Sequence, residues 1–195
     1  MRRLFPVLTL ALALGLLLVA GVISRARSLA PSNQSEPGGA FELVDQTGKV
    51  TRQDVLRGKW TVVFFGFTYC PDVCPTTLAA LGQAQSLLGP KAAKLQVVFI
   101  SLDPERDRPA QLNTYLTNDA FPKATIGLTG SRDQVAAAAK AYRIYYEKSG
   151  SGSDYVINHS TASYLMDPKG RFSKVLPYGI GPEEIAKQIA ESMAK

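Results

Sequence analysis

Two cysteines, Cys70 and Cys74, are the only thiols in this chain of 195 residues, and three residues separate them. The apolar run WTVVFFGF at residues 60–67 precedes them and predicts a buried strand, while residues 75–88 have leucines at helical spacing. Because a helix N-terminus favours thiolate over thiol, we expect a lowered cysteine pKa at this junction. Sulfurs about one helical turn apart can chelate one soft ion, so this spacing shifts the prediction toward metal binding.

Two other interpretations of the cysteine pair have less in their favour. A disulfide could join Cys70 only to Cys74, and closing so short a loop stabilises a fold weakly. That disulfide would therefore serve redox chemistry better than it would serve stability. A pair of inert buried cysteines fits poorly with a junction between a strand and a helix that contains the turn-forming Pro71 and Pro75.

His159 is the only histidine in the chain, so any imidazole ligand must come from it. A lone histidine usually has only a structural role, but two thiolates need a third donor to complete a trigonal site, and a Cys2His set suits copper. Strand alternation in YVINH places Tyr155, Ile157 and His159 on one face, with His159 near the strand end. The sequence leaves open whether that end faces the cysteines.

Asp103 lies in the segment SLDPERD, directly after a second apolar run at residues 95–102. Functional groups collect beyond the carboxyl ends of strands in open α/β sheets, so Asp103 could support the site. In the alternative interpretation, Asp103 and Asp107 cap turns and Arg106 pairs with a neighbouring carboxylate.

The remaining elements predict a mixed α/β sandwich, and a thioredoxin-like core fits their order. We expect a hairpin at residues 41–55, strands at 60–67, 95–102, 125–128, 155–166 and 171–176, and helices at 75–88, 108–118, 133–146 and 182–193. The stretch SGSGS at residues 149–153 is typical of a solvent-exposed loop.

Residues 1–27 contain the twenty uncharged residues LFPVLTLALALGLLLVAGVI, long enough for a transmembrane helix. We expect a membrane anchor at 1–27, a flexible linker at 28–40 and one domain at 41–195. The alternative is a cleaved signal peptide, for which residues 28–30 (SLA) offer a site, although Pro31 follows directly. The short leader favours a single-pass protein of the bacterial inner membrane with its domain in the periplasm; a mitochondrial inner membrane is the alternative.

Charge argues against a nucleic-acid partner. The net charge of +6 falls to +2 without the four arginines in residues 1–27, leaving 18 basic and 16 acidic residues. Neither a run of basic residues nor aromatics interleaved with one is present, so the electrostatic footprint of a nucleic-acid binder is missing.

Three motifs together resemble the Sco/SenC family, in that family's order. They are FTYCPDVCP at residues 67–75, SLDPERDRP at 101–109 and YVINHSTASYLMDPKG at 155–170. The resemblance runs from about residue 41 to the C-terminus and includes the N-terminal anchor. It implies a thioredoxin-like fold, with a central mixed sheet flanked by helices and a β-hairpin insertion.

The resemblance also implies a site and a task. One copper ion per chain, Cu(I) or Cu(II), would be bound by Cys70, Cys74 and His159, with Asp103 as a supporting residue. The task would be to help mature the dicopper CuA centre in subunit II of cytochrome c oxidase. The family usually has an aspartate directly before the histidine, whereas this chain has Asn158.

Two functions compete on these residues. A copper chaperone would need all three donors, would not be an enzyme in the usual sense, and would have oxidase subunit II and another copper chaperone as partners. A membrane-tethered thiol-disulfide oxidoreductase would use Cys70 and Cys74 as its redox-active pair to reduce the cysteines of subunit II, with a thioredoxin-like reductant as partner and no need for His159. A thiol peroxidase is disfavoured, because the peroxide-binding arrangement of threonine and arginine that peroxiredoxins have is not evident around Cys70.

Overall fold

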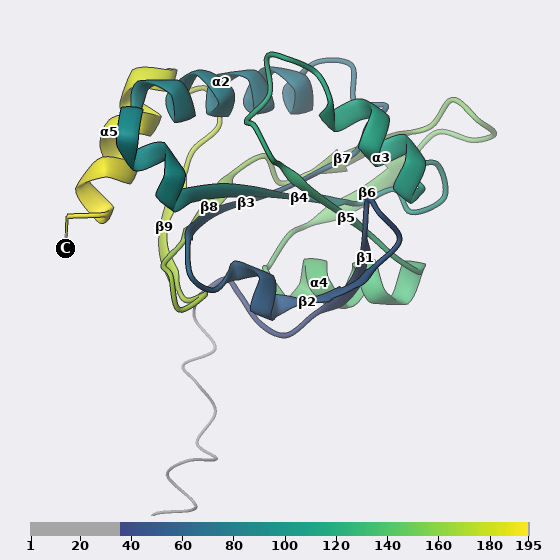
Figure 1. The fold of residues 1–195 in the computed structure, drawn as a ribbon. Helices are drawn as coiled ribbons and strands as arrows, with labels where there is room; N and C mark the ends of the chain where they lie inside the picture. Colours follow the sequence, from purple (N-terminus) through teal and green to yellow (C-terminus); the bar gives the residue numbers. More distant parts are fainter. Residues whose placement is uncertain (1–35, 195) are drawn as a thin grey trace, which may run out of the picture. The chain divides into compact units, whose positions relative to one another are not determined.

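The structure is a computed structural model that describes residues 36–194. Its centre is a seven-stranded mixed sheet with the order β2-β1-β5-β4-β3-β8-β9 (Figure 1). The strands are β1 (Glu42–Asp45), β2 (Val50–Arg52), β3 (Trp60–Gly66), β4 (Leu95–Ser101), β5 (Ile126–Thr129), β8 (Ser163–Met166) and β9 (Phe172–Leu176). β4 pairs in parallel with β3 and β5, and the other pairs in this sheet are antiparallel.

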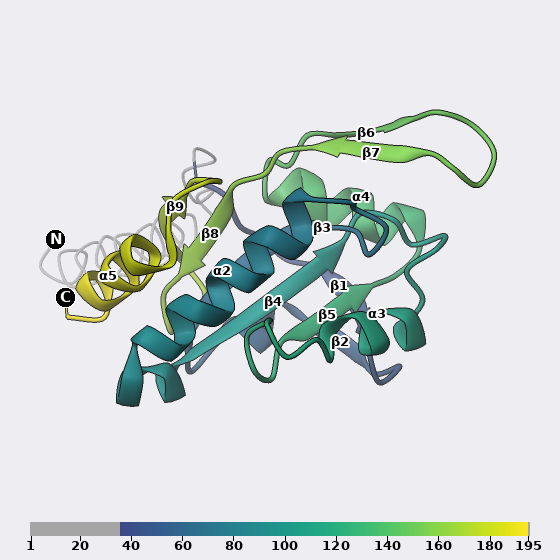
Figure 2. The same cartoon turned by 90° about the horizontal axis from the view of Figure 1, so that it is seen from above.

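Helices cover both faces of this sheet. They are α2 (Val73–Leu87), α3 (Pro109–Leu116), α4 (Arg132–Ala141) and α5 (Pro182–Ser192), with short 3-10 turns η1 (Gln53–Leu56) and η2 (Gly89–Lys94). Figures 1 and 2 show α2, α3 and α5 on one face and α4 on the other. The predicted mixed α/β sandwich is therefore the observed architecture.

The core lies where β3 and β4 pass between the two helical layers. Phe64, Phe65 and Phe99 are fully buried, which is why both strands are continuous apolar runs. Proline begins α3 at Pro109 and α5 at Pro182, as a residue that needs no N–H partner and already has a helical φ.

Two predicted elements are wrong in their extent. The helix expected over residues 133–146 ends at Ala141, because Arg143 has a left-handed φ of 57° and the chain turns into strand β6 (Tyr146–Ser149). The single strand expected over residues 155–166 is two strands. β7 (Val156–His159) pairs only with β6 in a separate two-stranded sheet, and β8 joins the main sheet.

The β6–β7 hairpin extends from one end of the domain (Figure 2). Residues 150–153 form its exposed tip, which agrees with the solvent loop predicted for this stretch. Its position was not predicted by periodicity, since the same apolar alternation suits a strand in either sheet.

The predicted membrane anchor at residues 1–27 lies outside the described residues, as does the first part of the predicted linker. Among the helices of residues 36–194, none combines the length and the apolar character that crossing a membrane requires. The last residues of the predicted linker already contact the domain, since Gly38 N–H donates to the carbonyl of Ala141 at 3.0 Å.

Candidate functional site

The two cysteines lie where β3 leads into α2. Cys70 is partly exposed in the connecting loop, and Cys74 is fully buried in the first turn of α2. No side chain caps this helix, and the Cys74 N–H instead points at the Cys70 sulfur, with N and Sγ 3.4 Å apart. The predicted strand-to-helix junction is confirmed, and both thiols are free.

The pKa values of the two thiols are shifted in opposite directions, mainly by the hydrogen bond between them and by burial. The pKa of Cys70 is lowered to about 4, first by the hydrogen bond from the Cys74 thiol, then by His159 and by the N–H groups of Asp72 and Cys74, against the cost of burial. The pKa of Cys74 is raised, because its thiol donates to Cys70 and because it is buried. The expected lowering therefore holds for Cys70 only, and near neutral pH the pair carries one negative charge and one proton.

His159 ends strand β7, and this strand end faces the cysteines. Its Nε2 lies 3.8 Å from the sulfur of Cys74. Its Nδ1 lies 2.7 Å from the carbonyl oxygen of Ser160; because that oxygen can only accept, Nδ1 carries a proton. Nε2 is therefore the ring nitrogen on the side of the thiols: with a proton it donates to the Cys70 sulfur, and without one it offers a lone pair to a metal ion.

The neighbours of His159 in β7 follow the predicted alternation. Tyr155 and Ile157 are buried on its face, whereas Asn158 is exposed on the other. The residue that departs from the family pattern, Asn158, thus lies on the opposite face from the imidazole.

Donor chemistry at this point of the fold suits a soft or borderline metal ion. Two sulfurs and one imidazole nitrogen form the type of set that copper prefers over the hard oxygen-seeking cations. Within residues 36–194, no group of three or more His, Cys, Asp or Glu side chains already has the spacing of a complete metal cage. A metal ion would therefore have to replace the hydrogen bond between the two sulfurs and the proton of Cys74.

Gly66, the last residue of β3, lets Cys74 pack against the sheet. A Cβ at this position would lie 2.8 Å from the Cys74 sulfur and 2.9 Å from Cε2 of Phe99, closer than real Cβ atoms come. Glycine is thus required by the close approach of α2 to β3.

Asp107 fixes the loop that precedes Cys70. Its buried carboxylate accepts hydrogen bonds from Thr68 N–H at 2.9 Å, Thr68 Oγ1 at 2.6 Å and Ser101 Oγ at 2.6 Å. Burial raises the pKa of Asp107, against these hydrogen bonds. Sequence reasoning considered Asp107 only as a turn cap; the partner Thr68 is 39 residues away, and no local signal announces it.

Asp103 is also buried, and its carboxylate contacts Arg106 and Tyr155. Arg106 Nε lies 2.5 Å from Oδ2, and Tyr155 OH donates to Oδ1 at 2.6 Å. Burial and this bond raise the pKa of Tyr155 to about 12, so its hydroxyl remains a donor at physiological pH. The contact with Arg106 is the pairing that the alternative interpretation of this segment predicts, and Tyr155 connects Asp103 to the hairpin of His159.

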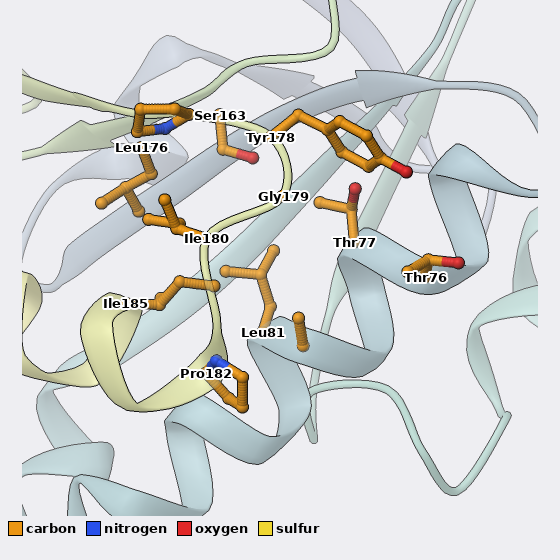
Figure 3. Close-up of a pocket in the computed structure, with 12 residues that line it drawn as sticks. Thr76, Thr77, Leu81, Ser163, Leu176, Tyr178, Gly179, Ile180, Pro182 and Ile185 are labelled. Atoms are coloured by element: carbon orange, nitrogen blue, oxygen red, sulfur yellow. The ribbon is translucent and has the colours of Figure 1, made fainter.

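An apolar cavity of about 250 Å³ lies beside α2 (Figure 3). It is lined by residues from α2, from the end of β9 and from the start of α5, among them Thr77, Leu81, Tyr178, Ile180 and Ile185. Neither cysteine lines it, so the cavity is separate from the thiol site.

Comparison with known proteins connects this arrangement to one family. The family model described as SCO1/SenC matches residues 30–194. An SCO2-like protein of Rickettsia prowazekii is 38% identical over 151 residues, which make up 76% of this chain and 73% of that protein.

Solved structures agree with these sequence matches. The structure of Bradyrhizobium japonicum ScoI with copper bound has 39% sequence identity and a TM-score of 0.73, covering 80% of this chain and 99% of that one. BsSco, described as having a disulfide switch and as a member of the Sco family of cytochrome c oxidase assembly proteins, has 25% identity and a TM-score of 0.66, covering 82% and 94%. The thioredoxin-like fold predicted for this chain is that of these proteins.

Proposed function

Since the chain belongs to the SCO1/SenC family, we propose that it binds copper and assists the assembly of cytochrome c oxidase. A relative with 39% identity is known with copper bound, and another structure is that of an oxidase assembly protein. In detail, one copper ion per chain is held by Cys70, Cys74 and His159 and is cargo for the CuA centre of oxidase subunit II.

The observation that carries this proposal is the meeting of His159 with the thiol pair. The Nε2 atom and the Cys74 sulfur are 3.8 Å apart although 85 residues separate them in sequence. Cys70 is already a thiolate, so it offers a ligand to an incoming ion without first losing a proton. Binding by both sulfurs then releases the Cys74 proton to solvent, and copper affinity should therefore rise with pH.

The two oxidation states of copper use this set differently. Soft thiolates favour Cu(I), and the imidazole adds the donor that helps to hold Cu(II). A three-coordinate site also leaves room for a ligand from a receiving protein, so that transfer can proceed by exchange of one donor at a time. We place this function on the periplasmic side of a bacterial inner membrane, supported by the uncharged stretch at residues 4–23.

Copper stoichiometry and affinity of the reduced chain test the proposal, with Cys70→Ala, Cys74→Ala and His159→Ala beside the wild type. Asn158→Ala is the matched control, because this side chain lies on the exposed face of β7. We expect one tight copper per chain, lost in each cysteine variant, weakened for Cu(II) in the histidine variant and unchanged in the control. A wild-type chain that binds no copper above background would refute the copper function.

A second function, thiol-disulfide exchange with subunit II, is favoured by the low pKa of Cys70. The Cys70 thiolate would attack a disulfide of the partner, forming a mixed disulfide and releasing one partner thiolate. Cys74 would then lose its proton and attack the Cys70 sulfur, which forms the internal disulfide and releases the second partner thiolate. The partner is reduced by two electrons and the pair is oxidised by two.

The two functions separate in the His159→Ala variant. Disulfide exchange needs only the sulfurs, and the hydrogen bond from Cys74, the larger cause of the low Cys70 pKa, remains in this variant, so it should still reduce an oxidised CuA domain of subunit II. Copper delivery to the same domain in its reduced form should fail or slow in that variant. If the wild type exchanges disulfides with this domain but transfers no copper to it, then reduction of the subunit II cysteines is the function.

A further inference from the structure

The β6–β7 hairpin carries His159 but does not belong to the main sheet (Figure 2). A two-stranded hairpin is at best marginally stable in water by itself. The position of the imidazole relative to the cysteines therefore depends on what holds the hairpin against the rest of the domain.

Arg106 connects the hairpin to the body of the domain. Its Nη1 donates to the carbonyl oxygen of Ser153 in the hairpin at 3.1 Å, and its guanidinium lies 3.7 Å from the ring centroid of Tyr155 at the start of β7. On the body side, its Nε pairs with the buried Asp103, which in turn accepts the hydroxyl of Tyr155.

The same guanidinium also reaches the loop of the thiols. It lies 4.6 Å from the ring centroid of Tyr69, the residue directly before Cys70. Tyr69 is still 55% exposed, so the stacking covers only part of its ring. One side chain thus contacts the hairpin, the body and the cysteine loop.

An ion pair also joins the hairpin to the body, and it contributes less than the contacts of Arg106. Lys148 of β6 lies 3.5 Å from Glu105, and both side chains are well exposed to solvent. Exposed pairs of this type contribute little. The Arg106 side chain is only 16% exposed, and its Nη2 is buried without a hydrogen-bond partner. The position of the Arg106 guanidinium is thus set by stacking on the tyrosine rings and by the pair with Asp103, rather than by a complete set of hydrogen bonds.

We propose that Arg106 is a positioning residue, which holds the His159 hairpin against the Cys70 loop and so sets the imidazole in reach of both sulfurs. The effect of Arg106 on copper binding rests on the proposed function, whereas its effect on the position of the hairpin does not. A lysine could still pair with Asp103, but it lacks the flat guanidinium face and the second directed N–H donor.

The test compares full-length wild type with Arg106→Lys and Arg106→Gln. Arg57→Gln is the matched control, because Arg57 also pairs with an aspartate three residues away, Asp54, but at an exposed position beside η1. The first readout is amide hydrogen exchange of the reduced, copper-free chain over residues 146–159. We expect faster exchange there in both Arg106 variants, with the strands of the main sheet protected as in the wild type.

The second readout is affinity for Cu(II) and for Cu(I). Removal of a ligand's own hydrogen-bond partner typically lowers metal affinity about 10–100-fold; because Arg106 acts one contact further from the ligands, we expect a loss of about tenfold, the lower end of that range, for Cu(II) in both Arg106 variants. Cu(I) affinity, which rests on the sulfurs, should fall less than about threefold. In a His159→Ala background, Arg106→Lys should not lower the Cu(II) affinity further, because Arg106 affects copper binding only by positioning the imidazole, which that variant lacks.

The positioning role of Arg106 and the copper function are contradicted by different results. Unchanged exchange of residues 146–159 in both variants would overturn the positioning role, whether or not copper binds. So would an equal loss of Cu(II) affinity with and without His159. Wild-type protein that binds no copper, with the hairpin released in the variants, would refute the copper function and leave Arg106 as the residue that positions the hairpin. If Arg106→Gln does not fold, Arg106→Lys decides the question.

Discussion

Replacing Gly66 by alanine tests how closely α2 must approach β3 for the thiol site to form. The new methyl group would lie 2.8 Å from the sulfur of Cys74 and 2.9 Å from Cε2 of Phe99. Both neighbours are fully buried, so neither can turn into solvent. Reaching ordinary contact, which begins at 3.4 Å, requires the sulfur or the strand to move by 0.6 Å.

The free-energy cost follows from two opposing effects. Overpacking a filled core costs about 1–3 kcal/mol. Alanine also restricts the unfolded chain, which returns about 0.4–1 kcal/mol. Since the added methyl group would meet two buried atoms at less than 3.0 Å, the overpacking cost should lie near the upper end, about 3 kcal/mol, and the net loss is then about 2 kcal/mol, which lowers the melting temperature by about 4–8 °C for a domain of this size. Copper affinity should fall as well, because a site tolerates displacements of only about 0.5 Å.

Thermal unfolding followed by circular dichroism, together with copper titration of the reduced protein, measures both effects. Gly181→Ala is the control: this residue has a φ of −68°, and the nearest atom to its added Cβ is the end of the flexible Glu183 side chain at 3.4 Å. Its melting temperature should change by less than about 3 °C. A Gly66→Ala protein that melts and binds copper like this control would refute the view that close packing on β3 positions Cys74.

Three further predictions concern the thiol pair, the loop that precedes it and helix α4. Alkylation of Cys70 by iodoacetamide should stay nearly constant from pH 8 down to about pH 5 and fall with a midpoint of about 4, since only the thiolate reacts. Mass spectrometry should find Cys74 unmodified at neutral pH, and a midpoint near that of a free thiol would contradict the shared proton. Asp107→Asn should lower the free energy of unfolding in urea by about 1–3 kcal/mol, while the same change at the exposed Asp119 should alter it by less than about 0.5 kcal/mol. Ser131→Ala removes the capping box of α4 and should cost about 0.5–2 kcal/mol in the same assay; no loss would mean that the cap does not stabilise the helix.

Local sequence patterns were sufficient for most elements of the fold. The apolar runs of β3 and β4, the hairpin of β1 and β2, and the proline-initiated helices α3 and α5 lie within a few residues of their predicted bounds. These predictions succeed because burial on both faces, turn chemistry and helix initiation each leave a signature within a few residues. The junction that carries Cys70 and Cys74 was predicted for the same reason.

Predictions failed where the local sequence is compatible with more than one structure. Residues 155–166 have the alternation of one strand, yet they are divided between the hairpin and the main sheet. Residues 142–146 continue a helix-forming segment, yet Arg143 adopts a left-handed conformation and the chain turns away. In both cases tertiary packing overrides a local propensity worth only a fraction of a kcal/mol per residue.

Residue types and spacing by themselves determined which side chains of this protein could do chemistry: two thiols one helical turn apart and a single imidazole at a strand end. Only the tertiary structure decided that the imidazole faces the thiols, that Cys70 rather than Cys74 holds the negative charge, and that Asp107 and Arg106 hold the loop and the hairpin. The charge on Cys70 comes first from its hydrogen bond with the Cys74 thiol, whose geometry only the fold fixes. The imidazole, the loop and the hairpin are placed by contacts between residues 39 to 85 positions apart, and contacts across such separations have no periodic signal in the sequence.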